Sequence, residues 1–221
     1  MKAMILAAGL GRRMGVLTQE LPKPLLSIEG RPLIDYHLQA LAAAGVTEVV
    51  INLHHLGERI QQFVGAGEHW DIRVTYSHEE QLLETGGGIL QALPLLGNEP
   101  FWLVNGDIAT DFDFSQFRRE TENHAHLVLV DNPPHHPQGD FVLASDGQVG
   151  LAGGQRYTYS GIALLRAELF AHKQPGAFAL GTLLKEQVKL GLVSGERYQG
   201  RWSDIGTPER LQQQRRTSSY R

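Results

Sequence analysis

The chain has 221 residues, of which 42% are hydrophobic and 20% charged. This length supplies one substantial apolar core, so we expect a single domain over residues 1–221. A net charge of -4 argues against a nucleic-acid partner, and the lack of cysteine excludes disulfides and thiolate metal sites. No apolar run approaches the roughly 18 residues of a membrane span, and the amino-terminal run is too short for a signal peptide. These features predict a soluble cytoplasmic protein that does not bind membranes.

The first 26 residues combine a strand with an anion-binding turn. Residues 3–8 form an uninterrupted apolar run, the pattern of a parallel strand buried on both faces. Gly9 and Gly11 follow, and glycines in such a turn let backbone N–H groups approach a phosphate. Arginines stand at 12–13, and Lys23 lies between two prolines that restrict its backbone. We therefore expect a phosphate-binding site in this stretch.

The first half of the chain continues as alternating helices and strands with short links. Apolar residues at helical spacing predict a helix over 33–44, which Gly45 would end. The following elements are predicted in chain order: strand 46–53, helix 56–64, strand 72–77, helix 83–96 and strand 101–104. Strand, helix and strand in this order indicate a parallel sheet.

The second half shows antiparallel features. Residues 131–138 are rich in proline and histidine and cannot form a regular helix or a central strand. The other predicted elements are strand 125–130, a hairpin of 141–144 with 148–151, strand 157–165, helix 180–190, an edge strand over 193–201 and helix 208–216. We therefore expect an α/β fold with a mixed, mostly parallel central sheet and helices on both faces.

Two motifs in the first 26 residues give the chain a family resemblance. The spacing of Gly9, Gly11 and Met14 lacks the third glycine of a dinucleotide-binding fingerprint, and it also fails the Walker A pattern. LAAGLGRRM at 6–14 and PKPL at 22–25 instead match the signature LAAGxGxRM…PKPL. The chain therefore resembles the sugar-phosphate nucleotidyltransferases. This resemblance implies a single-domain, Rossmann-like fold of the glycosyltransferase-A type and the transfer of a nucleoside monophosphate to a sugar 1-phosphate with release of pyrophosphate.

The resemblance also implies how the triphosphate is held. Arg13 would bind its β- and γ-phosphates, and Lys23 would bridge the α-phosphate and the incoming sugar phosphate. The backbone amides of Gly9 and Gly11 would line the triphosphate. Two anions must meet in this reaction, so charge neutralisation and in-line positioning are the tasks of the enzyme, and no protein nucleophile is required.

Two aspartates are the implied ligands of a Mg²⁺ cofactor. Asp107 follows the predicted strand 101–104, and Asp204 lies in the late segment Trp202-x-Asp204-x-Gly206-Thr207. The family resemblance pairs these positions, although they are far apart in the sequence. Mg²⁺ prefers one or two carboxylates together with substrate phosphate oxygens, which agrees with this pairing.

Base recognition would fall to backbone groups and to one carboxylate. In the resembled family it uses the backbone after the first strand and a polar residue before the next glycine-rich helix start, which is Glu79 here. A carboxylate only accepts hydrogen bonds, so it suits the N–H of uracil, thymine or guanine and disfavours cytosine. The nucleotide-binding candidates are Ala7, Ala8, Gly9, Gly11, Glu79, Glu84 and Gly86.

Fewer sequence features indicate the residues of the sugar pocket than those of the nucleotide site. Matches to family positions that line it are Asn105, Asp140, Ser160 and Gly161. Many relatives hold the sugar phosphate with a Glu-Lys pair in the middle of the chain, and residues 150–156 lack one. The cation for the sugar phosphate is therefore open, with Arg156 as one candidate.

Three functions are compatible with these residues. LETGGGI at 83–89 and the short chain resemble most closely the small bacterial N-acetylmuramate α-1-phosphate uridylyltransferases of peptidoglycan recycling, which would use UTP. A mannose-1-phosphate guanylyltransferase is an alternative, because Glu79 also suits guanine. The third is a catalytically weak nucleotide-sugar-binding protein, because Gly15-Val16 replaces a usual proline and the Glu-Lys pair is missing. In each case we expect a monomer with a nucleotide and a sugar phosphate as partners.

The ten histidines do not predict a metal site. Neighbours such as His54-His55 and His135-His136 lack a cysteine or a nearby glutamate to complete a ligand set. We interpret them as surface or loop residues.

Overall fold

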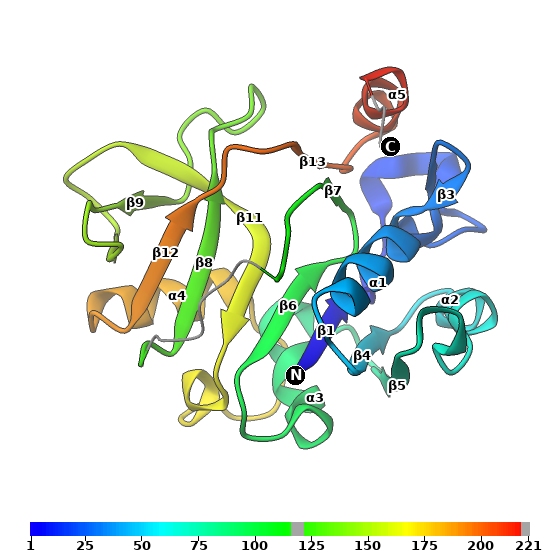
Figure 1. Cartoon of the computed structure of the whole chain (residues 1–221), viewed down its shortest axis with the longest axis horizontal. Helices are drawn as coiled ribbons and strands as arrows, with labels where there is room; N and C mark the ends of the chain where they lie inside the picture. The colour runs from blue at the N-terminus through cyan, green and yellow to red at the C-terminus, as the bar shows by residue number, and fades with distance from the viewer. Residues whose placement is uncertain (116–121, 218–221) are drawn as a thin grey trace.

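The computed structural model describes residues 1–115 and 122–217, in which βα units are followed by antiparallel strands (Figure 1). The helices are α1 (Leu33–Ala43), α2 (Gly57–Val64), α3 (Glu84–Leu96), α4 (Leu180–Lys189) and α5 (Pro208–Thr217), with short 3-10 turns η1 (Arg12–Thr18), η2 (Lys23–Leu25), η3 (Glu68–Trp70) and η4 (Ala167–Phe170). The first strands are β1 (Lys2–Leu6), β2 (Ser27–Ile28), β3 (Arg31–Pro32), β4 (Glu48–Leu53), β5 (Arg73–His78), β6 (Phe101–Asn105) and β7 (Ile108–Thr110). The later strands are β8 (Ala125–Val130), β9 (Phe141–Leu143), β10 (Val149–Gly150), β11 (Arg156–Leu165), β12 (Val193–Arg197) and β13 (Trp202–Asp204).

One nine-stranded mixed sheet runs through the molecule. Its order is β10-β9-β11-β6-β1-β4-β5, and β8 joins β11 to β12. The strands β5, β4, β1 and β6 are parallel, whereas β11 is antiparallel to β6. The predicted α/β fold with a mixed sheet and helices on both faces is confirmed. A single domain over residues 1–221 stays a prediction.

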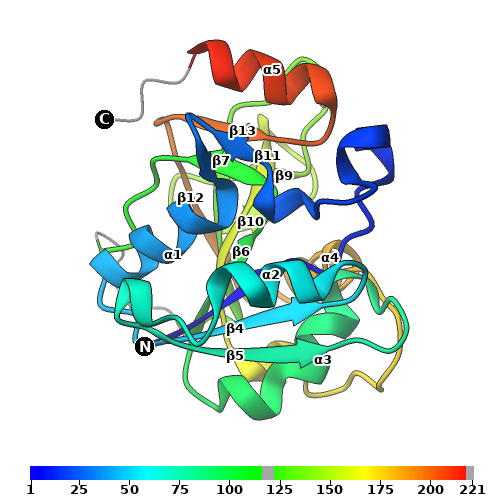
Figure 2. The ribbon, with the colours of Figure 1, turned by 90° about the vertical axis from the view of Figure 1, so that its right-hand side faces the viewer.

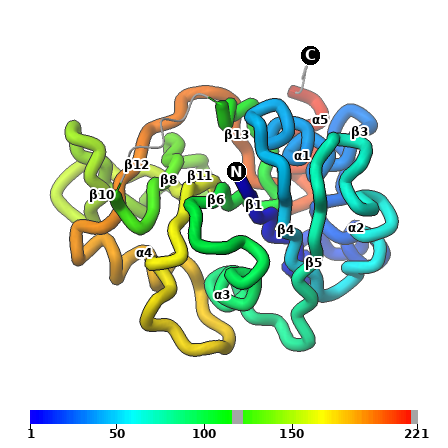
Figure 3. The backbone as a smooth tube through the Cα atoms, turned by 60° about the horizontal axis from the view of Figure 1, so that its bottom comes forward, coloured from blue at the N-terminus to red at the C-terminus, as the bar shows by residue number. Residues whose placement is uncertain are grey.

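Two apolar cores cover the two faces of this sheet. In β1, Ala3 and Ile5 join the core formed with α1 and α2, while Met4 joins the core formed with α3 and α4. Figure 3 shows α1 on one side of the strands and α3 with α4 on the other. Ile5 and Met4 are fully buried, and each contributes about 1.5–3 kcal/mol by leaving water. This burial on both faces explains why the strand reads as a continuous apolar run.

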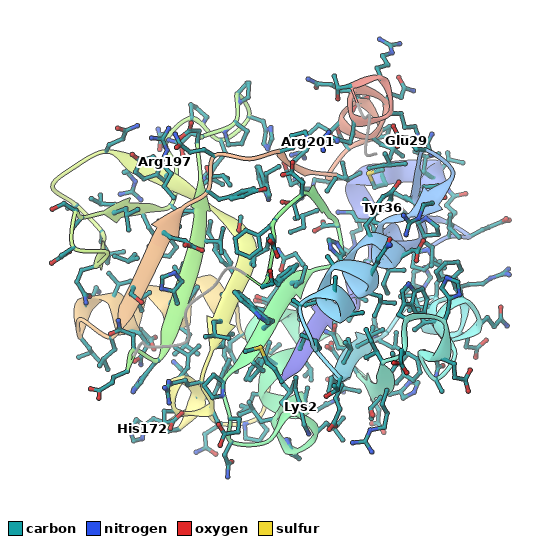
Figure 4. All side chains as sticks on the ribbon, in the orientation of Figure 1. Lys2, Glu29, Tyr36, His172, Arg197 and Arg201 are labelled. Carbon is teal, nitrogen blue, oxygen red and sulfur yellow. The ribbon has the colours of Figure 1, made fainter. Side chains whose placement is uncertain are left out.

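The carboxyl ends of the parallel strands meet at one edge. Leu6 pairs with Asn52 of β4 and with Asn105 of β6, so the segments after these strands start side by side. In an open α/β sheet, ligands bind at this edge. Figure 4 shows Lys2, at the start of β1, at the opposite end of the molecule from Arg201, which precedes β13.

A small additional layer covers the binding edge. β13 pairs with β7 in a two-stranded antiparallel sheet, and Figure 2 shows α5 above both strands. This layer is held by a separate apolar cluster of Met14, Leu26, Ile28, Leu33, Ala109, Ile205 and Leu211. The edge strand predicted over 193–201 is confirmed as β12, but it ends at Arg197, and the chain then enters the small sheet as β13. No helix of the described segments is long and apolar enough to cross a membrane.

Candidate active site

The glycine turn after β1 forms an open basic pocket. Gly11 has a φ of 63°, a left-handed conformation that favours glycine, and its carbonyl accepts hydrogen bonds from Met14 N at 2.8 Å and Thr18 Oγ1 at 3.0 Å. These bonds fold η1 back on the turn and leave Arg13 exposed. The pocket measures about 370 Å³ and is lined by Leu10, Gly11, Arg12, Arg13, Lys23 and Leu82.

A second pocket of about 260 Å³ adjoins the first at the carboxyl edge of the parallel strands. Lys23 and Leu82 line both pockets. Its lining residues are Leu6, Ala7, Ala8, Gly9, Lys23, Pro24, Asn52, Glu79, Leu82, Glu84, Thr85, Asn105 and Asp107. The structure thus brings most of the predicted nucleotide-binding residues into one cavity, next to a pocket that contains both arginines of the turn.

An ion pair lies in the wall of the second pocket. Lys23 Nζ lies 3.0 Å from Asp107 Oδ2. Lys23 is the first residue of η2, and Asp107 lies in the turn between β6 and β7. The Lys23 side chain is 12% exposed and that of Asp107 31%, so both can be reached from the pocket. This arrangement offers a cation to a phosphate and a carboxylate to a metal ion.

The small sheet brings Asp204 next to Asp107 in the fold. Asp204 pairs with Ile108, and the next residue, Ile205, donates its N–H to the carbonyl of Asp107 at 2.8 Å. Asp204 therefore ends β13, and Asp107 directly precedes β7, the strand paired with it. Their predicted convergence depends on β7, a three-residue strand that the sequence pattern did not indicate.

One oxygen of Asp204 accepts a hydrogen bond, and the other has a histidine nearby but no hydrogen bond. Oδ2 accepts a hydrogen bond from Arg210 Nη1 of α5. His135 Nε2 lies 2.9 Å from Oδ1, but its geometry does not make a hydrogen bond, so this buried oxygen accepts none within the described chain. Residues 1–115 and 122–217 contain no group of three or more metal-ligating side chains. Two carboxylates with an unfilled acceptor fit Mg²⁺, which completes its octahedron with water and phosphate oxygens.

A neutral histidine lies under this site. His37 of α1 is 3% exposed, and burial lowers its pKa to about 4, although the charge of Asp107 opposes this shift. Its ring also contacts the backbone of Ile108. His37 is therefore uncharged at neutral pH and leaves the charge balance of the site to the acidic and basic side chains.

Glu79 is held by two protein donors. Its side chain is largely buried, with 5% exposed; Oε1 accepts from Asn52 Nδ2 at 2.7 Å, and Oε2 accepts from Leu83 N at 3.0 Å. Asn52 in turn accepts the N–H of Ala7 at 2.8 Å. Sequence reasoning missed Asn52, although it is the only amide in the apolar run of β4. A polar residue at the end of a buried strand was the available signal.

Besides Asp204, four predicted site residues lie outside the lining of both described pockets. The N–H of Gly86 donates to the carbonyl of Phe178 at 2.8 Å. Asp140 Oδ2 accepts from Tyr159 N at 2.9 Å. Ser160 is 1% exposed, and Gly161 packs directly against the side chain of Asn105. These contacts brace loops and strands around the pockets.

Side chains within and beside loop residues 131–140 hold this loop near Asp204. His136 Nε2 lies 3.0 Å from Asp140 Oδ1, and His135 approaches Asp204 as described above. Both histidines are partly exposed residues of the loop between β8 and β9, which confirms their interpretation as surface or loop residues, and each also lies beside an aspartate. Arg156 donates to the carbonyls of Gln138, Leu151 and Asp140, at 3.1, 2.8 and 2.6 Å. This guanidinium holds the loop together rather than lining either pocket.

Known proteins that are similar to this chain are named as nucleotidyltransferases. An N-acetylmuramate alpha-1-phosphate uridylyltransferase of Neisseria meningitidis serogroup B (strain ATCC BAA-335 / MC58) is 47% identical over 96% of this chain and 96% of its own length. One of Caulobacter vibrioides (strain ATCC 19089 / CIP 103742 / CB 15) is 33% identical over 94% and 92%. A mannose-1-phosphate guanyltransferase of Aspergillus fumigatus (strain ATCC MYA-4609 / CBS 101355 / FGSC A1100 / Af293) is 33% identical but covers only 62% of this chain and 42% of its own.

Solved structures share the fold at lower identity. A putative glucose-1-phosphate thymidylyltransferase from Bacillus anthracis, solved with a sucrose, has a TM-score of 0.85 at 21% identity and covers 98% of this chain and 94% of its own. The family model described as Nucleotidyl transferase matches residues 2–152. This match spans the glycine turn, Lys23 and Asp107, and it confirms the resemblance found in the sequence. The chain belongs to the nucleotidyl transferase family.

Proposed function

We propose that this chain transfers UMP from UTP to a sugar 1-phosphate, with N-acetylmuramate α-1-phosphate as the acceptor, in peptidoglycan recycling in the cytoplasm. The observation that carries the proposal is the meeting of the glycine turn, Lys23 and Asp107 in two adjoining pockets. The identity of 47% with a relative of that name, over nearly the whole of both chains, supports the choice of substrates.

The pockets suit a direct displacement at phosphorus. An oxygen of the sugar phosphate attacks the α-phosphorus of UTP, the bond to the α,β-bridging oxygen breaks, and pyrophosphate leaves with that electron pair. Lys23 lines both pockets and would contact the α-phosphate between them. Arg13 and the amides of the turn would hold the leaving pyrophosphate in the basic pocket. Such a reaction depends on positioning and charge neutralisation.

Asp107 and Asp204 would hold a Mg²⁺ ion. When bound, this ion would neutralise charge on the phosphates during transfer. The orphaned Oδ1 of Asp204 and the partly exposed carboxylate of Asp107 support this assignment. Each carboxylate also contacts a basic side chain, Arg210 and Lys23 respectively, which balances the two negative charges.

Pyrophosphate release from a panel of substrates tests the proposal. UTP, GTP and CTP are each combined with N-acetylmuramate α-1-phosphate, N-acetylglucosamine 1-phosphate and mannose 1-phosphate in the presence of Mg²⁺. We expect the highest kcat/KM with UTP and N-acetylmuramate α-1-phosphate. Preference for GTP and mannose 1-phosphate would favour the guanylyltransferase alternative, and tight UDP-sugar binding without turnover would favour a binding protein. Lys23→Ala serves as the control for contaminating activity.

A further inference from the structure

A chain of hydrogen bonds runs along the wall of the second pocket, which measures about 260 Å³. It starts at the N–H of Ala7 after β1, passes through the side chains of Asn52 and Glu79, and ends at the N–H of Leu83 before α3. The three bonds measure 2.8, 2.7 and 3.0 Å. They join the ends of β1 and β4 to the loop after β5, three segments that line the same cavity.

The partners of Asn52 fix the orientation of its amide. Its oxygen must face the N–H of Ala7, and its nitrogen must face the carboxylate of Glu79. The flipped amide would set donor against donor and acceptor against acceptor. Asn52 is 2% exposed, so water cannot relieve such a mismatch. Only one orientation of this amide is compatible with its surroundings.

The same logic requires a carboxylate at position 79. Each oxygen of Glu79 accepts from a different protein donor, Asn52 Nδ2 or Leu83 N. A glutamine has one oxygen, so beside Asn52 it would leave one of these donors facing its NH₂ group. Gly88 of α3 makes room for the pair, because a Cβ there would lie 2.5 Å from Glu79 Oε1 and 2.9 Å from Asn52 Nδ2.

We propose that Asn52 is a positioning residue for base recognition: its amide holds the Glu79 carboxylate as an acceptor facing the pocket and thereby selects a base that presents a ring N–H. This inference rests on the proposed function and adds the residue that sets its base preference. Each oxygen of Glu79 keeps a second lone pair that the protein does not use. Uracil, which carries an N–H at position 3, would be accepted, whereas the unprotonated N3 of cytosine would be repelled.

Exchanging the amide at position 52 and the carboxylate at position 79 tests whether Asn52 acts through Glu79. Asn52→Asp places a second carboxylate oxygen against Glu79 Oε1, and Glu79→Gln leaves one donor unmatched. In the double variant Asn52→Asp/Glu79→Gln, the carboxylate at position 52 accepts from Ala7 N and from the amide at position 79, whose oxygen accepts from Leu83 N. Every donor of the network then faces an acceptor again, with the carboxylate now at position 52 and the amide at position 79.

Calorimetric binding of UTP and CTP, without an acceptor sugar, provides the readout, together with melting temperatures. We expect each single variant to bind UTP at least tenfold more weakly than the wild type. The double variant should recover much of the UTP affinity and melting temperature, because its network is complete. Its preference for UTP over CTP should fall at least fivefold, because an amide at position 79 offers both a donor and an acceptor to the base.

The alternatives give different results. UTP affinity unchanged in Asn52→Asp, or a double variant that binds UTP no better than the single variants, would overturn the inference. A purely structural role for Asn52 would lower the melting temperature of Asn52→Asp but leave the UTP-over-CTP ratio of this single variant at the wild-type value. A wild type that binds no UTP would overturn the proposed function as well, whereas UTP binding without pyrophosphate release would overturn the proposed function alone. Asn98→Asp, at an exposed position after α3, is the matched control and should bind UTP normally.

Discussion

At the residue scale, the two aspartates of the candidate site each contact a basic side chain. Lys23 contacts Asp107, and Arg210 contacts Asp204. All four side chains are between 12% and 31% exposed, so their interactions are stronger than those of fully exposed pairs. In the proposed function, this balance would keep the two carboxylates from repelling the phosphates of the substrate.

Lys23→Ala separates the catalytic use of this pair from its structural use. We expect kcat for pyrophosphate release to fall by a factor of about 10²–10³, because a cation at the developing charge is removed. The free energy of unfolding should change by less than about 1 kcal/mol, because partly exposed ion pairs contribute little to stability. Steady-state kinetics and urea unfolding measure the two effects.

Lys2→Ala is the control for losing a lysine ion pair. Lys2 Nζ lies 3.3 Å from Glu48 Oε2 at the opposite edge of the sheet, and this variant should keep full activity. A Lys23→Ala enzyme within threefold of the wild type would contradict the assigned role.

Glu84→Gly tests a strained residue in the pocket. Glu84 has a φ of +57°, which is unfavourable for a side-chain-bearing residue by roughly 1–2 kcal/mol. We expect the glycine variant to be more stable by up to about 1 kcal/mol, because part of that gain is offset by the entropy of the unfolded chain. The neighbouring Glu80 has no positive φ, so Glu80→Gly should destabilise instead. If urea unfolding showed equal losses of unfolding free energy in Glu84→Gly and Glu80→Gly, the backbone of Glu84 would not be strained.

The sequence predicted those site residues that belong to contiguous motifs. Lys23 and Asp107 were predicted because PKPL and the end of a buried strand are local signals. Asn52 was not, because its role depends on Ala7 and Glu79, which lie 45 and 27 positions away. His135 was missed for the same reason, since only the folded loop brings it to Asp204. Such pairings follow from strand order, which a single sequence does not specify.

At the element scale, the start of α3 joins the two halves of the chain. Thr85 Oγ1 accepts the N–H of Leu180 at 2.9 Å, and Phe178 accepts from Gly86 at 2.8 Å. Residues 176–180 lie so close to the helix that Gly86 and Gly87 leave no room for a Cβ, whereas the neighbouring Gly88 faces Glu79 and Asn52. A Cβ on Gly87 would be 2.1 Å from the carbonyl oxygen of Gly176. The sequence showed the three glycines, but it could not show which segment lies against them.

Gly87→Ala should therefore destabilise the protein although alanine is the better helix former. Alanine gains about 1 kcal/mol over glycine inside an unobstructed helix. Against a fixed backbone carbonyl, we expect a net loss of about 1–3 kcal/mol from overpacking. Urea unfolding measures the difference.

Gly181→Ala in α4 is the matched control, because a Cβ there meets nothing within 4 Å. It should raise stability by about 0.5–1 kcal/mol. Similar values for both glycines would show that segment 176–180 moves away at little cost.

Element boundaries were predicted closely where periodicity is strong. Helix 33–44 corresponds to α1, and strand 157–165 corresponds to β11. The strands β2, β3 and β7 were not predicted, because two or three residues carry no readable period. The break between β12 and β13 depends on Asp111, which accepts hydrogen bonds from Tyr198 and Arg201 and bends the chain between the two strands.

At the scale of the whole molecule, the parallel and antiparallel parts of the sheet meet at β6 and β11. The parallel half carries the pockets, because the glycine turn and the ends of β4 and β6 lie at one edge. The antiparallel half contains the loop 131–140. It also contains β12, after which the chain continues into β13 and Asp204. The βαβ order predicted the first half. The position of β1 between β4 and β6 was not predictable, because it depends on which strands exchange hydrogen bonds.

The fold also buries two histidines in an uncharged form. Burial lowers the pKa of His37 in α1 and of His126 in β8 to about 4 each. In the unfolded chain a histidine has a pKa of about 6.5. Between these values the unfolded state binds more protons than the folded state. The free energy of unfolding therefore rises with pH in this window, and it falls as pH is lowered from 6.5 to 4.

Acid should consequently destabilise the protein before most carboxylates are protonated. His37, which is 3% exposed, alone accounts for a loss of about 3 kcal/mol between pH 6.5 and pH 4. Urea unfolding at a series of pH values should show this slope in the wild type, and a shallower one in His37→Gln, because the substituted side chain takes up no proton on unfolding. The variant should start from lower stability at pH 7, since the packing under the site is disturbed. An unfolding free energy that stays constant between pH 6.5 and 4.5 would mean that His37 is already protonated inside the folded molecule.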